Sequence, residues 1–238
     1  MPRPQPLLLL PPSEGKAPGG AGPRWAAGTM RDAGLDRARA TVLRAAAAAG
    51  AVDRRGPTLP AMERYTGVLY KELAWGTLPA PARRRGEDRV RVVSGLWGVV
   101  APSDPVPHYK LKMSARLDDL GRLSAWWKPR LAPVLAERTA GAVVWDLLPN
   151  EHALAMDWGA CSPARRVTVR FVDASDRTVS HWNKVLKGAL VRWLLTDQPA
   201  GPEALAGFDH PLGYRFDAAA SDLDGSVASV VLRERPAR

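Results

Sequence analysis

The chain has 238 residues, with 34 Lys and Arg against 24 Asp and Glu, so its formal net charge is +10. A chain of this length is usually a single domain and is long enough to bury a substantial core. A hydrophobic content of 46% and a charged content of 24% exclude wholesale disorder. The single cysteine, Cys161, excludes an internal disulfide framework, and four scattered histidines give no local metal signature. We therefore expect no bound metal and no cofactor.

The positive charge is concentrated in the first third of the chain. Residues 1–91 carry 16 cations and 8 anions, whereas residues 167–238 carry 9 of each. A positive balance favours nucleic acid, an anionic membrane or a phosphorylated ligand as partner, without choosing among them. Because 27 of the cations are arginines in a chain rich in Ala, Gly and Pro, we interpret part of the arginine content as a coding bias. The few lysines are therefore better markers of a site than the net charge.

No segment is predicted to enter a membrane. Leu7–Leu10 is a short apolar run, and Pro11 and Pro12 end it at once. Four residues are too few for the core of a signal peptide and far too few to span a bilayer. We expect a cytoplasmic protein without a membrane partner, and the sequence leaves its oligomeric state open.

The first half of the chain is predicted to begin with a strand and to continue mainly in helices. Residues 1–10 give a short buried strand, because the apolar run is bounded by prolines. The next elements expected are a helix over 30–49, a second over 60–75, a basic loop over 77–90, a strand, sharp turn and second short element over 90–100, and an irregular segment over 101–108.

The second half mixes strands and helices without strict alternation. Residues 142–148 are apolar enough for a central strand, and residues 167–172 alternate as a strand with one wet face. The other elements expected are a helix over 122–138 that kinks or restarts near Pro129 and Pro133, a helix over 180–195, a short helix over 202–206, and strands over 212–216 and 226–232. This mixture predicts an α/β (mixed α+β) fold, a single domain over 1–238 whose mixed central sheet is flanked by helices.

The first candidate motif follows the N-terminal strand. Ser13, Glu14, Gly15 and Lys16 offer a hydroxyl, a carboxylate, free backbone N–H groups and an ammonium within one loop. Such a turn can hold a phosphate. It is not a Walker A loop, since the glycine spacing differs and no Ser or Thr follows Lys16. An ordinary proline-rich turn is the alternative.

A second motif runs from residue 93 to residue 113. Two glycines flank Trp97, and an irregular loop then leads to Tyr109, Lys110 and Lys112. Tyr109 can stack on a base or donate a hydrogen bond, and either lysine can neutralise a phosphate. A purely structural glycine turn is the alternative.

Two further sets of polar residues lie in the second half. In the helix expected over 180–195, Lys184, Lys187 and Arg192 are close enough in angle to form a basic stripe, unless they are only solvated surface charge. Glu151 and His152 directly follow the strand over 142–148, where α/β proteins often place ligands, and such a pair can do general acid–base work. The alternative for this pair is a capped helix start with exposed polar residues.

Together these motifs resemble the YaaA family, known as peroxide stress proteins. They keep their order from residue 7 to about residue 217, so the resemblance covers nearly the whole chain. The segments that carry it are Leu-Leu-Pro-Pro-Ser-Glu-Gly-Lys at 9–16, Ser-Gly-Leu-Trp-Gly-Val-Val-Ala-Pro at 94–102 with Tyr109 and Met113, the helix with Lys184, Lys187, Gly188 and Arg192, and the closing Gly207-Phe208, Gly213-Tyr214 and Phe216-Asp217.

The resemblance implies an intracellular protein of mixed α/β fold that serves the hydrogen peroxide (oxidative) stress response, with limitation of free iron as its benefit. It also implies DNA binding through a positive cleft with a helix-hairpin-helix-like element. The chain departs from the family pattern at Ala17, Ala101 and Lys187, and at residues 148–152, where His152 stands in the position of a Tyr. These departures suggest a divergent member whose activity can differ.

Three hypotheses follow. The first is a DNA-binding stress protein. The second is an enzyme, a hydrolase acting on a nucleotide, nucleoside or nucleobase, for example at an N-glycosidic bond. For this enzyme the candidate catalytic residues are Glu151, Glu14 and Tyr109, and the candidate ligand or phosphate-binding residues are Ser13, Lys16, Lys112, Asn150, Lys184 and Lys187. The third, direct iron binding, is weak because the histidines are dispersed. Convergence of the lysine-bearing motifs in one concave site favours the enzyme, and a broad basic groove favours DNA.

Overall fold

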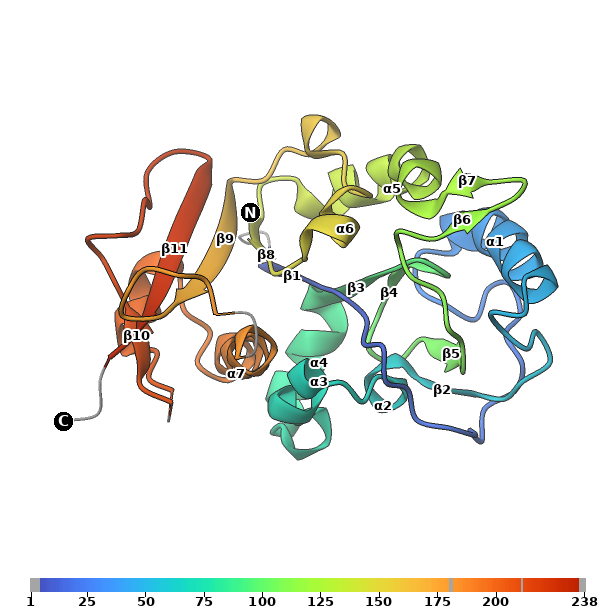
Figure 1. Cartoon of the computed structure of the whole chain (residues 1–238), viewed down its shortest axis with the longest axis horizontal. Coiled ribbons are helices and arrows are strands. Elements are labelled where there is room, and N and C mark those ends of the chain that lie inside the picture. Colours follow the sequence, from blue (N-terminus) through green and yellow to red (C-terminus); the bar gives the residue numbers. More distant parts are fainter. Residues whose placement is uncertain (1–4, 180–181, 211, 236–238) are drawn as a thin grey trace.

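The computed structural model describes residues 5–179, 182–210 and 212–235, and its centre is a mixed seven-stranded sheet (Figure 1). Its strands, in spatial order, are β10 (Tyr214–Phe216), β11 (Val227–Glu234), β9 (Arg165–Val172), β8 (Val143–Asp146), β1 (Leu7–Leu10), β3 (Val90–Ser94) and β4 (Gly98–Val100). The inner pairs from β11 to β3 are parallel, whereas β10 and β4 pair antiparallel at the two edges. The predicted mixed α/β class is confirmed.

Two small antiparallel pairs lie outside this sheet. β2 (Thr58–Pro60) pairs with β5 (Pro105–Pro107), and β6 (Arg116–Leu117) pairs with β7 (Gly121–Arg122). The expectation that residues 101–108 are wholly irregular is therefore wrong. The prolines of β5 are tolerated because β2 and β5 form a two-stranded pair, in which each strand leaves one edge free of partners.

The α-helices differ most from the sequence prediction over residues 60–75 and 77–90. They are α1 (Asp36–Ala48), α2 (Ala61–Arg64), α3 (Val68–Leu73), α4 (Ala80–Arg89), α5 (Leu123–Thr139), α6 (Asn150–Ala153) and α7 (Asn183–Thr196). The helix expected over 60–75 is two helices, because Tyr65 is extended (φ −83°, ψ 116°) and pairs across a bridge with Lys16. The prediction of a loop over 77–90 is wrong, since α4 occupies most of this segment. Pro79 directly precedes α4 and Pro81 lies in its first turn, where proline is tolerated. No helix in the described residues is long and apolar enough to cross a membrane.

Short 3₁₀ helices complete the description, at Ala33–Leu35, Trp75–Thr77, Trp158–Ala160 and Pro202–Gly207. α5 continues through Pro129 and Pro133 rather than restarting at either. The predicted helix over 180–195 corresponds to α7, although residues 180 and 181 lie outside the described residues.

The core explains why the central strands read as continuous apolar runs. All four residues of β1 and all five of β3 are buried, since each strand has a neighbour on both sides in the sheet and helices cover its faces. Figure 1 shows α3, α4 and α7 together on one side of these strands, with α5 and α6 on the other. The sheet therefore keeps a layer of helices on each face, and its strand ends remain available for a site.

Helices α3 and α7 approach each other closely at Gly188. A Cβ added there would lie 2.7 Å from the Cβ of Glu72 and closer still to the carbonyl oxygen of Leu69. We expect Gly188→Ala to lower the free energy of unfolding by about 1–3 kcal/mol, because overpacking against backbone exceeds the gain in helix propensity. Urea denaturation measures this. Gly76→Ala is the control, since an added Cβ there meets nothing within 4 Å. Equal stability of the two variants would contradict the prediction.

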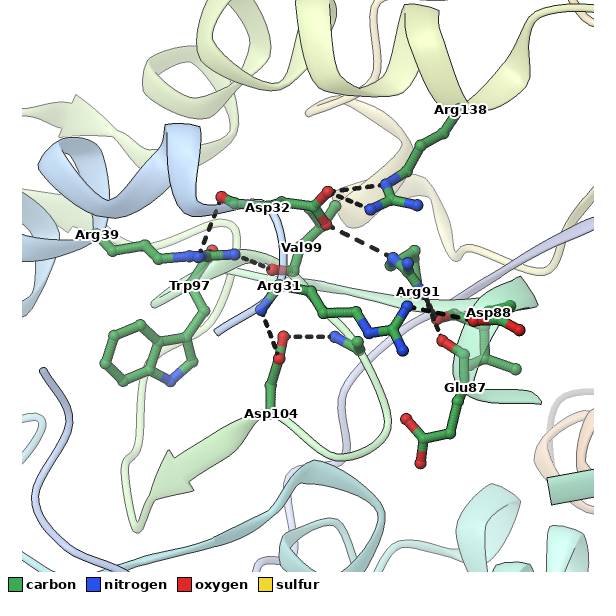
Figure 2. Close-up of polar contacts among 12 residues, drawn as sticks. Arg31, Asp32, Arg39, Glu87, Asp88, Arg91, Trp97, Val99, Asp104 and Arg138 are labelled. Atoms are coloured by element: carbon green, nitrogen blue, oxygen red, sulfur yellow. Dashed lines mark hydrogen bonds and ion pairs between the residues drawn. The ribbon is translucent and has the colours of Figure 1, made fainter. Parts of the chain in front are cut away.

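Two arginines are buried in a charge cluster that joins α1, β3, α5 and the segments beside them (Figure 2). The Arg39 guanidinium donates to Asp36 Oδ1 (2.9 Å) and to the carbonyl oxygens of Val99 (2.9 Å) and Trp97 (3.2 Å). The Arg91 Nε lies 3.6 Å from Asp32 Oδ2, and burial lowers the Arg91 pKa to about 10. From the sequence, we interpret part of the arginine content as a coding bias. Arg39 and Arg91, however, belong to the buried core.

The same cluster fixes the segment before α1. Asp32 has a left-handed backbone (φ 57°), and its carboxylate also accepts from Arg138 on α5 (Nε to Oδ1, 2.9 Å). Asp104 accepts from the backbone N–H groups of Arg31 (2.7 Å) and Ala101 (2.8 Å). Burial raises the Asp104 pKa against these hydrogen bonds. Within the cluster, Asp32 Oδ2 and the Nε and Nη2 of Arg91 have no hydrogen-bond partner among the described residues, so Arg91 is held there partly by charge alone.

Candidate functional site

The topology of the sheet explains how the motifs come together. β3, β1 and β8 are parallel neighbours, so the segments that leave their carboxyl ends meet at one edge of the sheet. Ser94 ends β3, the Ser13–Lys16 loop follows β1, and Glu151 with His152 follows β8. A site at the carboxyl ends of parallel strands is the usual place for ligands in α/β proteins.

Two adjoining cavities open at this edge, with volumes of about 350 and 300 Å³. The residues common to both are Pro12, Ser13, Glu14, Glu151 and His152. The first cavity is also lined by Lys16, Lys110 and Lys112, and the second by Lys184 and Tyr70. The lysine-bearing motifs therefore converge on one concave site.

Lys16 is the most enclosed of the lysines at this site. Its Nζ donates to the Ser13 carbonyl oxygen (2.8 Å) and lies 4.2 Å from the ring centroid of Tyr109 and 5.8 Å from that of Tyr65. Burial lowers the Lys16 pKa to about 8; Glu14 acts in the opposite direction and Arg64 adds to the decrease. A large fraction of Lys16 is therefore a neutral amine slightly above neutral pH.

Hydrogen bonds between buried hydroxyl groups hold the two tyrosine rings that lie beside Lys16. The Tyr109 hydroxyl lies 2.9 Å from the Tyr65 hydroxyl and 2.9 Å from Ser94 Oγ, in the core. Burial raises the pKa of both tyrosines, so both phenols stay neutral. Tyr109, predicted as a candidate acid or base, presents the face of its ring to Lys16 while its hydroxyl points into this network.

Glu14 and Lys112 form an ion pair at the mouth of the first cavity, with 3.0 Å between Glu14 Oε1 and Lys112 Nζ. Both side chains are largely exposed. Lys112, followed by Lys184 and against the small effect of burial, lowers the Glu14 pKa, and Glu14 raises that of Lys112. A ligand phosphate can replace the carboxylate as the partner of Lys112, because the pair is in contact with water.

Glu151 and His152 lie in the single turn of α6. Glu151 Oε2 accepts a hydrogen bond from Ser114 Oγ (2.9 Å), and its Oε1 lies 3.6 Å from His152 Nδ1. The His152 side chain is buried, and its Nδ1 has no hydrogen-bond partner among the described residues. Burial lowers the His152 pKa against the raising effect of Glu151, so the ring is neutral at pH 7.

Three predicted site residues line neither cavity: Tyr109, whose ring lies beneath Lys16, and Lys187 and Asn150. Lys187 is largely enclosed and donates from Nζ to the Leu147 carbonyl oxygen (2.9 Å), and burial lowers its pKa. Asn150 is an exposed residue at the start of α6, where its carbonyl oxygen accepts from the Leu154 N–H. Arg192 donates to the Leu73 and Ala74 carbonyl oxygens, so the cations of α7 meet different partners rather than forming one stripe.

The sequence did not single out Tyr65, Tyr70 or Ser94 as site residues. Tyr65 lies beneath Lys16, and the Tyr70 hydroxyl donates to the Pro11 carbonyl oxygen (2.7 Å), which steadies the loop. Ser94 holds the Tyr109 hydroxyl. The signal for Ser94 was its place beside Gly95 in the second motif, whereas Tyr65 and Tyr70 lie in the segment 60–75, which the sequence predicts only as a helix.

The arrangement supplies several cations for an anionic group, and two carboxylates, Glu14 and Glu151, that line both cavities. No group of three or more His, Cys, Asp or Glu in the described residues is placed to hold a metal ion. The side chains present can bind an anion through lysine and transfer a proton through Glu151 or Glu14.

The fold and site define a mixed α/β protein with a lysine-rich pocket at the carboxyl edge of its sheet. A family model described as peroxide stress protein YaaA matches residues 30–220. A UPF0246 protein of Streptomyces coelicolor is 38% identical over 241 residues, covering 90% of this chain and 93% of the relative. UPF0246 proteins of Methylibium petroleiphilum (37%; 71% and 68% covered) and Corynebacterium efficiens (33%; 80% and 85%) are also similar. The chain belongs to the YaaA peroxide stress protein family.

Proposed function

We propose that this peroxide stress protein binds and acts on a nucleotide-like anion in its two adjoining cavities. The observation that carries the proposal is the convergence of Lys16, Lys112 and Lys184 with Glu14 and Glu151 around cavities of about 350 and 300 Å³. Volumes of this size are typical of small-molecule sites, and the few convergent polar groups fix a ligand's orientation.

The roles follow from position. Lys112, which is exposed, and Lys110 bind the phosphate at the open end of the first cavity. Glu151, held by Ser114, lies on the wall shared by both cavities and acts as the general acid or base. In hydrolysis of an N-glycosidic bond, water adds to the anomeric carbon, the bond to the base breaks, and the base leaves with a proton.

The test is a screen of purified protein against nucleotides, nucleosides and nucleobases, with released base quantified by chromatography. For a nucleotide that turns over, we expect Lys112→Ala to raise KM by about tenfold, because it removes one charge-assisted hydrogen bond. Lys71→Ala is the control, since Lys71 is exposed on α3 and lines neither cavity. Absence of turnover across the whole panel would refute the enzyme.

DNA binding is the second candidate, and one observation favours it. A further cavity of about 330 Å³, lined by Lys110, His108 and Asp53, adjoins the first cavity at Lys110 and lengthens the path beyond a single nucleotide. Together with the net charge of +10, this suits a strand of nucleic acid. We expect binding to a fluorescent DNA duplex to weaken steeply with salt, because phosphate contacts release counterions. No binding at low salt, or affinity unchanged by salt, excludes this candidate.

A further inference from the structure

Lys16 differs from the other lysines of the site in how its ammonium is solvated. Lys112 is largely exposed and paired with Glu14, whereas Lys16 forms no ion pair within 4.0 Å among the described residues. Its Nζ lies between the Ser13 carbonyl oxygen and the face of Tyr109. Lys16 is therefore held in place by one hydrogen bond and an aromatic face. These protein groups take the place of the water and the carboxylate that surround an ordinary surface lysine.

The groups that face Lys16 come from three segments. Glu14 lies on the same loop as Lys16. Arg64 is the last residue of α2 and Tyr65 follows it, whereas His108 and Tyr109 directly follow β5. Glu14 favours the ammonium, but its carboxylate is directed to Lys112, and Arg64 opposes the ammonium. A lysine that is desolvated and next to another cation is the arrangement that produces a nucleophilic amine.

We propose that Lys16 forms a Schiff base with the aldehyde of a phosphorylated sugar in the first cavity. This inference rests on the proposed function, because cleavage of an N-glycosidic bond releases a sugar phosphate whose open-chain form carries an aldehyde. Lys16 and the phosphate-binding Lys112 both line that cavity, so the aldehyde and the phosphate of one ligand can be held at the same time.

The step balances without any oxidant or reductant. The neutral Lys16 amine attacks the aldehyde carbon and forms a carbinolamine. The nitrogen then gives up its protons and the carbonyl oxygen leaves as water, so that an imine forms. Glu151, which lines the same cavity, is placed to take a proton from the nitrogen and to give it to the leaving oxygen. Addition of water reverses the reaction and restores the amine.

Borohydride trapping tests the proposal. The full chain is incubated with ribose 5-phosphate and cyanoborohydride, and the modified lysine is located by peptide mass spectrometry. We expect Lys16 to carry the reduced adduct first, because at pH 7 its neutral fraction is at least roughly a hundredfold that of an ordinary lysine. Its labelling should rise about tenfold from pH 7 to pH 9 and then level, following the Lys16 pKa of about 8.

The matched variant is Lys16→Arg, which keeps the charge and removes the amine. It should lose the early adduct, whereas Lys71→Arg should keep it. Equal labelling of Lys16 and Lys71, or unchanged labelling in Lys16→Arg, overturns the proposal. The proposed function is tested separately. Trapping at Lys16 without nucleotide turnover supports the Schiff base and refutes the enzyme. Turnover without trapping supports the enzyme and refutes the Schiff base.

Discussion

Replacing Arg39 by Met is expected to lower the free energy of unfolding by about 3–5 kcal/mol. The Arg39 side chain is fully buried and satisfies Asp36 together with the carbonyl oxygens of Trp97 and Val99. Met fills a similar volume but donates nothing, so Asp36 Oδ1 and the carbonyl oxygens of Asp32, Trp97 and Val99 each lose a hydrogen bond. Urea denaturation followed by tryptophan fluorescence measures the loss.

The control for this prediction lies two residues away, on another face of α1. Arg37→Met on the same helix replaces an exposed arginine and should change stability by less than about 0.5 kcal/mol. Arg39→Lys keeps the charge but not the planar fork, so we expect a loss between the two. If Arg39→Met were as stable as Arg37→Met, the cluster would contribute no net stability. If Arg39→Met does not fold, the comparison of Arg39→Lys with Arg37→Met still shows whether position 39 contributes more to the unfolding free energy than position 37.

Much of the sheet could be predicted because its signal is local. Leu7–Leu10 and residues 142–148 are short apolar runs, and the structure places them side by side as β1 and β8. Once parallel pairing is established, Ser13–Lys16 and Glu151 must meet at the same edge. The convergence of the candidate site therefore follows from strand order, which local sequence patterns do not specify.

What could not be predicted depends on long-range packing. Arg39 and Arg84 look alike in the sequence, yet Arg39 is buried against β4 and Arg84 is exposed on α4. The Asp36–Arg39 spacing was a local hint, since residues three apart share a helix face. For Lys187 there was no such hint, because its partner is a carbonyl oxygen 40 positions away in the chain.

For a nucleotide that the protein hydrolyses, Glu151→Gln is expected to lower kcat by about 10²–10⁴-fold. The substitution is nearly isosteric, and the amide oxygen of Gln still accepts from Ser114, so the geometry at α6 is retained while proton transfer is lost. Burial lowers the pKa of the neighbouring His152, which disfavours a protonated ring beside Glu151.

The pattern of effects separates this role from a structural one. Glu151→Gln should leave the unfolding free energy and KM nearly unchanged, whereas Lys112→Ala acts through KM. Glu63→Gln, on the exposed side of α2, is the matched control and should leave both constants unchanged. Glu14→Gln should affect KM more than kcat, because Glu14 is paired with Lys112 at the cavity mouth. A kcat that falls with Glu14→Gln and not with Glu151→Gln would exchange the two carboxylates and place the acid–base group on the β1 loop instead of α6.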